Sequence, residues 1–315
     1  MDRFEDGEVT MGGAPFNLTF QLHQLLMLSG YGEAVMVSRV GSDAWGQHIL
    51  KRIQDARMSA EFVQIDPVRA TGSANVFAHN GGAGFEIVPH VAWDAIERTD
   101  ALQQLARRCD AVVFGSLAQR SEPSRETIQS FVAQVNGPRL YDVNLRRNTT
   151  DGVAGYSVEI IERCLELATI LKMNDTELEE VASMLAVKSD LSPGEERIWS
   201  LVAALCGKYK LDMVAITRGE RGALLMRGGE RLRLADSSLP QDQVHPVGAG
   251  DAFSAGLLFG VVAGWDLSRC SELAETLSSW VVTHTSATPV FTPEIAERIQ
   301  GILAKTQAEL LAGAR

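Results

Sequence analysis

The sequence predicts an α/β protein of three layers, in which helices cover both faces of a mostly parallel central sheet. Two observations lead to this prediction. Short apolar runs rich in β-branched residues alternate with helical periods, and 45% of the 315 residues are hydrophobic, which is enough for a sizeable core. Alternating strands and helices form parallel sheets, because each helix buries its apolar side against the sheet. We expect a single domain over residues 1–315.

The elements can be placed in order along the chain. The pattern LTFQLHQLLMLSG predicts the first helix, the run AVMVSRV at 34–40 predicts a buried strand, and an amphipathic helix follows at 47–58. Further strands are predicted at 111–116, 139–144, 169–174 and 212–217, and further helices at 124–135, 158–168, 175–185 and 195–208. A hairpin around RGERGALL and GGERLRL, two helices after Asp251 and an amphipathic helix over 293–311 complete the pattern.

Residues 61–91 interrupt this alternation. The runs FVQI, SANVFAH and FEIVPH are typical of short strands, with a turn at NGGAG. We expect this segment to leave the main sheet as a small β lid. The segment 1–11 lacks the apolar strand that should open such a fold, so we expect the numbering to begin inside that strand.

Composition narrows the classes of function. The chain has 29 basic and 40 acidic residues and a formal net charge of −11, which argues against nucleic-acid or anionic-membrane partners because nothing offsets phosphate repulsion. The start of the chain is polar, so we expect no secretory signal, and the longest apolar run, 257–265, is too short to cross a bilayer. Four cysteines without metal-ligand spacing predict reduced, mostly buried thiols, so we expect a cytoplasmic protein.

The stretch HPVGAGDAFSAGLLFG, residues 245–260, places an aspartate where a turn becomes an apolar helix. A helix N-terminus offers N–H groups and a partial positive charge to an anion, and Gly248 and Gly250 let the backbone approach it closely. Asp251, kept ionised by the helix dipole, can then accept the proton of a hydroxyl that attacks phosphorus. Taken alone, the same residues equally suit an ordinary N-cap with a tight turn.

Two other segments carry polar groups that suit such a site. In GGAPFN, Gly12 and Gly13 allow close approach to the backbone, and Asn17 offers both a donor and an acceptor to hydroxyls. In DVNLR, Arg146 lies on the same side of an outgoing strand as Asp142 and can clamp a phosphate or an acidic group. A plain loop and a strand-end ion pair explain these residues as well.

Two further segments follow strands later in the chain. In NDTE, Asn174 caps a helix and Glu177 lies three residues on, an ordinary capping arrangement that can also hold water around Mg²⁺. In TRGERGALL, Thr217, Gly219 and Gly222 can line a nucleotide groove or simply form a turn. The chain has no Walker motif, no protein-kinase signature and no dinucleotide fingerprint.

Together these segments resemble a known family. GGAPFN, RVGSDAWG, DVNLR, KMNDTE, TRGERGA and PVGAGDAFSAG occur in the order seen in ribokinase-like (PfkB) carbohydrate kinases, over nearly the whole chain. The GGAP form of the first motif is most similar to bacterial fructokinases. The resemblance implies a ribokinase-like fold and ATP-dependent phosphorylation of a sugar's primary hydroxyl.

The resemblance also implies roles for individual residues. Asp251 matches the general base, and Gly248, Ala249 and Gly250 match an anion hole for the transferred phosphoryl group. Asn174 and Glu177 match the NxxE motif that is associated with phosphate and, through water, with Mg²⁺.

The sugar side of the site is implied in the same way. Gly13 and Asn17 match sugar-contacting residues, and Asp2 falls where the first strand of the family ends in a sugar-binding aspartate. The lid of the family closes over the sugar and often makes dimer contacts, so we expect a homodimer through residues 61–91.

One motif departs from the family pattern. His245 stands in place of an acidic residue linked to a monovalent-cation site, and Val247 in place of a threonine, so no potassium-activated site is implied. Fructose is the expected sugar. The alternatives are another sugar or sugar acid, such as ribose or 2-keto-3-deoxygluconate, and a non-catalytic sugar- or nucleotide-sensing protein.

Overall fold

The computed structural model describes residues 1–4, 9–79, 82–148, 155–236 and 245–313. These residues fall into two compact units. The first comprises Met1–Met11, Val37–Arg52 and Glu61–Asp236, and the second comprises Gly12–Met36, Ile53–Ala60 and Ser237–Arg315. The single domain over residues 1–315 remains a prediction.

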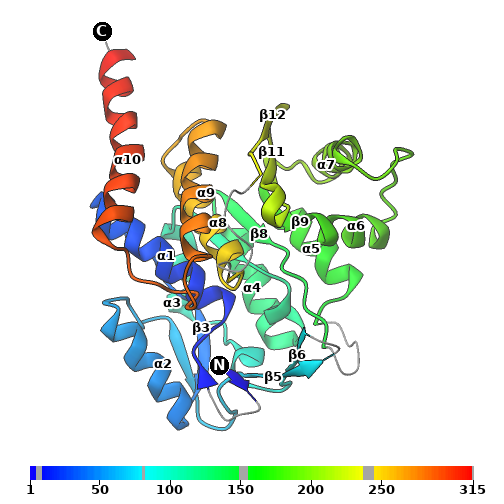
Figure 1. Cartoon of the computed structure of the whole chain (residues 1–315). Coiled ribbons are helices and arrows are strands. Elements are labelled where there is room, and N and C mark those ends of the chain that lie inside the picture. The colour runs from blue at the N-terminus through cyan, green and yellow to red at the C-terminus, as the bar shows by residue number, and fades with distance from the viewer. Residues whose placement is uncertain (5–8, 80–81, 149–154, 237–244, 314–315) are drawn as a thin grey trace. The chain divides into compact units, whose positions relative to one another are not determined.

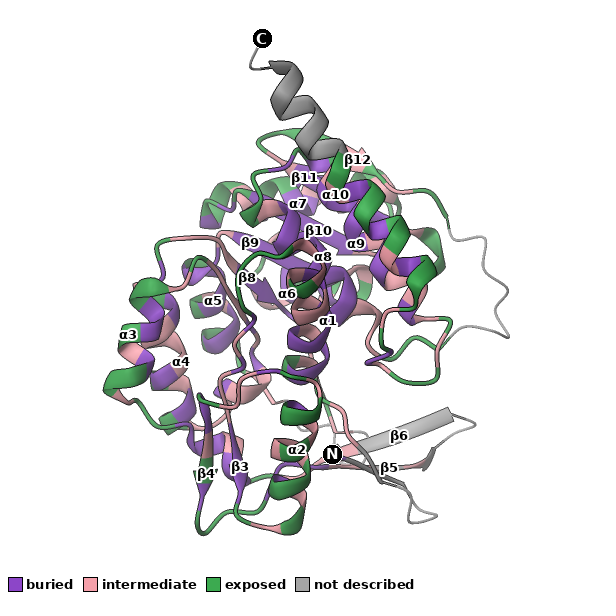
Figure 2. Ribbon diagram, turned by 90° about the vertical axis from the view of Figure 1, so that its left-hand side faces the viewer, coloured by how far each residue is buried: buried purple, intermediate pink, exposed green. Residues whose placement is uncertain are grey.

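The first unit is built on a six-stranded sheet of order β12-β11-β10-β9-β8-β7 (Figure 1). Its parallel strands are β7 (Val112–Phe114), β8 (Arg139–Asp142), β9 (Ile170–Asn174) and β10 (Met213–Thr217), and β11 (Ala223–Arg227) and β12 (Glu230–Arg233) continue it antiparallel. Strands β9 and β10 are buried at four successive positions, as expected of strands covered on both faces (Figure 2). The predicted mostly parallel sheet is confirmed.

Helices join these strands. They are α3 (Asp100–Arg108), α4 (Glu122–Gln134), α5 (Val158–Leu167), α6 (Asp175–Met184) and α7 (Glu195–Tyr209). Local signals explain where they begin: Thr99 caps α3, Ser157 caps α5, and Pro123 stands in the first turn of α4. Short 3-10 helices lie at Ala92–Ala95, Leu117–Gln119 and Gly219–Arg221. Helix α3 was not among the predicted elements.

Strands β5 and β6 leave the main sheet as predicted, but the rest of the β-rich region differs from the prediction. A four-stranded sheet has the order β2-β1-β5-β6, where β1 is Asp2–Phe4, β2 Val9–Thr10, β5 Ala74–His79 and β6 Gly82–Ile87. The first predicted strand of the lid corresponds to β4 (Val63–Asp66) and pairs instead with β3 (Ser38–Gly41) in a separate parallel sheet, with α2 (Ala44–Asp55) following β3. Backbone pairing with β5 accounts for β1, although its sequence shows no apolar run.

The second unit is helical. It contains α1 (Ala14–Ser29), α8 (Ala249–Val262), α9 (Leu267–Val281) and α10 (Pro293–Gly313). Helix α8 is buried at ten successive positions from Asp251 to Gly260 (Figure 2), as expected of a helix that is apolar on all sides. It contacts α1 and α9, and Gly256 lies so close to α9 that an added Cβ would be 2.8 Å from the Cα of Ala274.

Two other expectations concern composition. Of the described helices, none is long and apolar enough to cross a membrane. The four cysteines are free thiols, with Cys164 and Cys270 buried and Cys109 and Cys206 half-buried. Burial raises the pKa of Cys164 to about 12, so this thiol is unreactive at neutral pH.

Candidate active site

The turn before α8 has a backbone conformation that depends on glycine. Gly248 is the N-cap of α8 with φ 86°, a left-handed conformation that favours glycine. A Cβ at this position would lie 2.6 Å from the Cβ of Ala287, so only glycine fits beside that residue. Ala249 and Gly250 form the first turn of the helix, whose N–H groups have no partner within the helix itself.

Asp251 and Asn17 meet at the N-terminal ends of α8 and α1. The side-chain amide of Asn17 donates a hydrogen bond of 2.8 Å to Oδ2 of Asp251. The two residues are only 4% and 9% exposed. The carbonyl Oδ1 of Asn17 is buried and has no hydrogen-bond partner among the described residues. A buried acceptor of this kind costs free energy unless a donor reaches it, and a ligand hydroxyl can supply that donor.

The glycines of the first motif set up the start of α1. Gly13 is its N-cap with φ 118°, and its carbonyl accepts the backbone N–H of Asn17 at 3.0 Å. Gly12 precedes it and is half-buried. Asp2 lies in β1, opposite Thr10 and Ala74 in the backbone pairing, and its side chain is outside the described part of the chain.

A separate group of charges in the first unit lies at the carboxyl end of β8 and at the neighbouring position in the middle of β9. Lys172 donates to both carboxylate oxygens of Asp142 at 3.2 Å, and both residues are buried. Arg146 follows on the outgoing loop and donates to the carbonyl of Leu145 at 3.0 Å. The strand-end ion pair that the sequence left open as an ordinary alternative is therefore present, but it joins Asp142 to Lys172.

Asn174 and Glu177 form a complete capping box at the start of α6. Oδ1 of Asn174 accepts the N–H of Glu177, and Oε2 of Glu177 accepts the N–H of Asn174, both at 2.8 Å. The other carboxylate oxygen of Glu177 accepts the N–H of Leu145 at 2.7 Å. Burial raises the pKa of Glu177, although these N–H groups and the charge of Lys172 oppose the rise.

These contacts limit how the pair can serve a metal ion. Both carboxylate oxygens of Glu177 already accept a backbone N–H, so each retains only one further lone pair. A contact with Mg²⁺ through water fits this geometry better than direct coordination, because Mg²⁺ keeps several of its waters. Among the described residues, no group of three or more His, Cys, Asp or Glu side chains could hold a metal ion.

The loop after β10 combines close packing with charge. Gly219 and Gly222 have φ 59° and 68°, and a Cβ on Gly222 would collide with the carbonyl of Ala235. Thr217 ends β10, and its hydroxyl lies 3.5 Å from the carbonyl of Met173. The buried Arg218 pairs with Glu195 at 3.2 Å. The conformation and packing of this turn therefore explain both glycines without a bound ligand.

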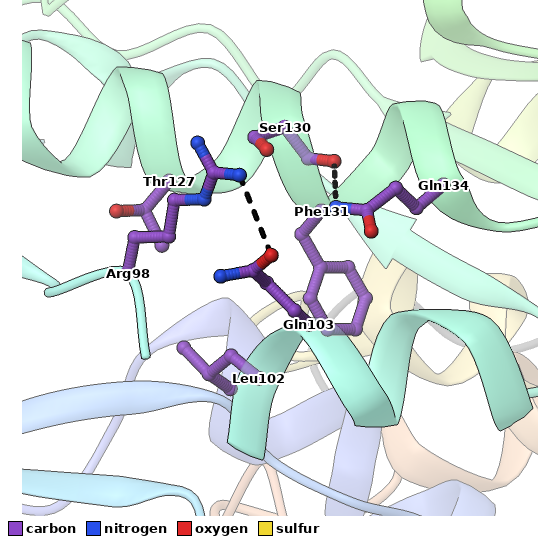
Figure 3. A pocket seen from close by; sticks show the side chains of 7 residues that line it. All are labelled: Arg98, Leu102, Gln103, Thr127, Ser130, Phe131 and Gln134. Atoms are coloured by element: carbon purple, nitrogen blue, oxygen red, sulfur yellow. Dashed lines mark hydrogen bonds between the residues drawn. The ribbon is translucent and has the colours of Figure 1, made fainter. Parts of the chain in front are cut away.

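A pocket lies between α3 and α4 (Figure 3). It is lined by Arg98, Leu102, Gln103, Thr127, Ser130, Phe131 and Gln134. None of the predicted site residues lines it.

Comparison with known proteins adds independent information. The family model described as pfkB family carbohydrate kinase matches residues 1–294. The fructokinase of Salmonella typhimurium is 25% identical to this chain, over 85% of the chain and 82% of the relative.

Solved structures agree on the fold. A fructokinase from Xylella fastidiosa, solved with bound ATP, superposes with a TM-score of 0.76 at 18% identity over 97% of this chain and 96% of that one. A 2-dehydro-3-deoxygluconokinase from Thermotoga maritima gives a TM-score of 0.73 at 17% identity over 93% of this chain and 91% of that one. The predicted ribokinase-like fold is confirmed.

Proposed function

The chain belongs to the pfkB family of carbohydrate kinases and is an ATP-dependent carbohydrate kinase, and we propose that it phosphorylates a primary hydroxyl of fructose. The name of the Salmonella typhimurium relative supports fructose as the acceptor. The observation that carries the proposed chemistry is the buried pair of Asn17 and Asp251 at the N-terminus of α8.

The proposed reaction uses Asp251 as the base. Its carboxylate accepts the proton of the sugar hydroxyl while that oxygen attacks the γ-phosphorus of MgATP, and the bond to the β-phosphate oxygen breaks to release ADP. Asn17 holds Asp251 on one side and presents its unpartnered Oδ1 to a second sugar hydroxyl. The turn at Gly248, Ala249 and Gly250 stabilises the charge on the transferred phosphoryl group through its N–H groups.

The remaining assignments complete the proposal. Gly12, Gly13 and Asp2 contribute to the sugar side, and Thr217, Gly219 and Gly222 to the nucleotide side. Asn174 and Glu177 contact the Mg²⁺ of MgATP through water. We also propose a cytoplasmic homodimer that associates through the lid at residues 61–91.

A sugar acid is the second candidate substrate. The half-buried guanidinium of Arg146 lies just beyond the carboxyl end of β8, where it can bind a carboxylate bidentately. The similarity in fold to a 2-dehydro-3-deoxygluconokinase is consistent with such an acceptor. This candidate changes the acceptor and leaves the role of Asp251 unchanged.

The test measures ADP release with a panel of acceptors. Fructose, ribose and 2-keto-3-deoxygluconate are compared at equal concentration with MgATP, and we expect the highest kcat/KM with fructose. A preference for the sugar acid that disappears in Arg146→Ala would replace fructose with the second candidate. Tight sugar binding without ADP release under any condition would instead indicate a sensing protein.

A further inference from the structure

Three polar side chains of α1 form a line along one face of the helix. Asn17, Gln21 and Gln24 are spaced at i, i+4 and i+7, so they lie one above the other. Asn17 and Gln21 are 4% and 0% exposed. Buried amides are costly unless they are hydrogen-bonded, so their partners show what this face of α1 holds in place.

The two glutamines bind the irregular segment between α9 and α10. Gln24 donates to the carbonyl of Pro289 at 3.1 Å, and its own carbonyl accepts the N–H of Phe291 at 2.7 Å. Gln21 donates to the carbonyl of Ala287 at 3.3 Å. Gln24 also donates to Oε1 of Gln21 at 3.3 Å, which joins the two amides into one group.

The segment that these glutamines hold is the one against which the turn of α8 rests. A Cβ on Gly248 would lie 2.6 Å from the Cβ of Ala287 and 3.0 Å from its carbonyl oxygen, so the two backbones are in close contact. The start of the turn is tied to the same region, because the N–H of His245 donates to the carbonyl of Val282 at 2.7 Å. The turn therefore depends on residues 282–291 for its position.

We propose that Gln21 and Gln24 are positioning residues for phosphoryl transfer, which set the place of the turn at Gly248 by holding residues 287–291 against it. Asn17, on the same face of α1, orients Asp251. Helix α1 thus orients the base by a direct hydrogen bond. It positions the turn at Gly248 indirectly, by holding residues 287–291. Figure 1 shows α1 and α8 in contact in the helical unit. The kinetic part of this inference rests on the proposed function.

The variants Gln21→Met and Gln24→Met test the inference. Methionine has a similar length and helix propensity but cannot make these hydrogen bonds, so the packing is largely kept. We expect each variant to lower kcat about 10-fold or more while the KM values for sugar and ATP change by less than about 3-fold, because a displaced turn weakens stabilisation of the transition state. The exposed Gln47 of α2 provides the matched control, and Gln47→Met should retain the wild-type kcat.

Amide hydrogen exchange without substrate gives a second readout that does not need activity. Both variants should exchange faster than the wild type at residues 245–252 as well as at 286–291, with unchanged exchange inside α9. Should Gln24→Met not fold, Ala287→Gly tests the same contact from the other side, and we expect it to lower kcat in the same way. Folded variants with wild-type kcat and wild-type exchange at 245–252 would overturn the inference. If the wild type releases no ADP with any sugar, the proposed function fails, and the exchange comparison alone decides whether the glutamines position the turn.

Discussion

The side-chain amide of Asn17 donates a 2.8 Å hydrogen bond to Oδ2 of Asp251, although 234 residues separate the two in sequence. The bond joins the N-terminal turns of α1 and α8, and it brings together residues from two of the motifs on which the resemblance to carbohydrate kinases rests. A carboxylate held in one orientation beside a helix N-terminus can act as a base without first reorganising.

Replacing Asp251 with asparagine tests the base directly. Asparagine has nearly the same size and cannot accept the proton, so Asp251→Asn should lower kcat by at least about 10²-fold. ATP affinity should change little, because the turn that precedes Asp251 is unaltered. Coupled ADP-release kinetics and an ATP titration measure the two effects. Turnover close to that of the wild type would disprove the assigned role.

The contact between Asn17 and Asp251 makes a prediction about pH. In Asn17→Asp, two carboxylates would face each other at hydrogen-bond distance and could not both ionise easily. The acidic limb of the kcat/KM profile should therefore move to higher pH than in the wild type. Asn17→Ala is the control: it only removes the hydrogen bond donated to Asp251, so it should lower kcat/KM and move the limb less than Asn17→Asp does. An unmoved limb in Asn17→Asp would show that the two groups are not coupled in the working enzyme.

Glu177 should prove important for stability in its own right. Glutamine has one carbonyl oxygen and cannot accept the N–H groups of both Asn174 and Leu145, so Glu177→Gln should destabilise the fold by about 1–3 kcal/mol. On the same helix, Glu179 makes an exposed ion pair with Arg197, and Glu179→Gln should cost at most about 1 kcal/mol. Denaturant unfolding compares the two variants. Equal stabilities of the two variants would show that the hydrogen bonds of Glu177 to Asn174 and Leu145 contribute little.

Asp66 should make the stability of the first unit depend on pH in the acidic range. Burial alone raises its pKa, but the N–H groups of Arg69 and Val68, followed by the charge of Arg39, outweigh burial and lower the pKa from 3.8 to about 2. A lowered pKa means that this stabilisation is present above the unfolded value and is lost as the pH falls through about 2. Asp66→Asn should be less stable than the wild type at pH 7.

The pH series distinguishes this effect from a general loss of stability. The difference in unfolding free energy between the wild type and Asp66→Asn should shrink as the pH is lowered from about 5 to about 2. Asp190 is exposed, and Asp190→Asn serves as the control with little effect at any pH. A difference that stays constant with pH would count against the assigned ion pair between Arg39 and Asp66.

Replacing two helical glycines with alanine should change the stability of the protein in opposite directions. At Gly256 a Cβ would lie 2.8 Å from Cα and 2.9 Å from N of Ala274, so Gly256→Ala should force α8 and α9 apart and cost about 1–3 kcal/mol. At Gly301 in α10 nothing lies within 4 Å of such a Cβ, and alanine should stabilise by about 0.5–1 kcal/mol. Thermal unfolding measures both. A neutral Gly256→Ala would show that the two helices are not in close contact.

Several parts of the fold and the site follow from local sequence. The runs at 169–174 and 212–217 predicted β9 and β10 because strands buried on both faces consist largely of apolar residues. The spacing of Asn174 and Glu177 predicted a helix start, and the structure has the complete capping box there. Each of these features depends on residues within a few positions of one another.

Long-range contacts decided the rest. Residues 2–4 form a strand because they pair with β5. Strand β4 is not part of the predicted lid because it pairs in parallel with β3. Gln21 and Gln24 look like ordinary helix formers in the sequence, and only the fold brings residues 287–291 to their amides.

The sequence by itself therefore determined the α/β class, the start of α8 at the GAGD turn and the carbohydrate-kinase family, because periodicity, caps and glycine-rich turns depend only on residues that are close together in the chain. Only the tertiary structure decided which side chains share the site. The partners of Asn17 and Gln24 lie more than 200 positions away, and a hydrogen bond between such distant residues leaves no periodic trace in the chain.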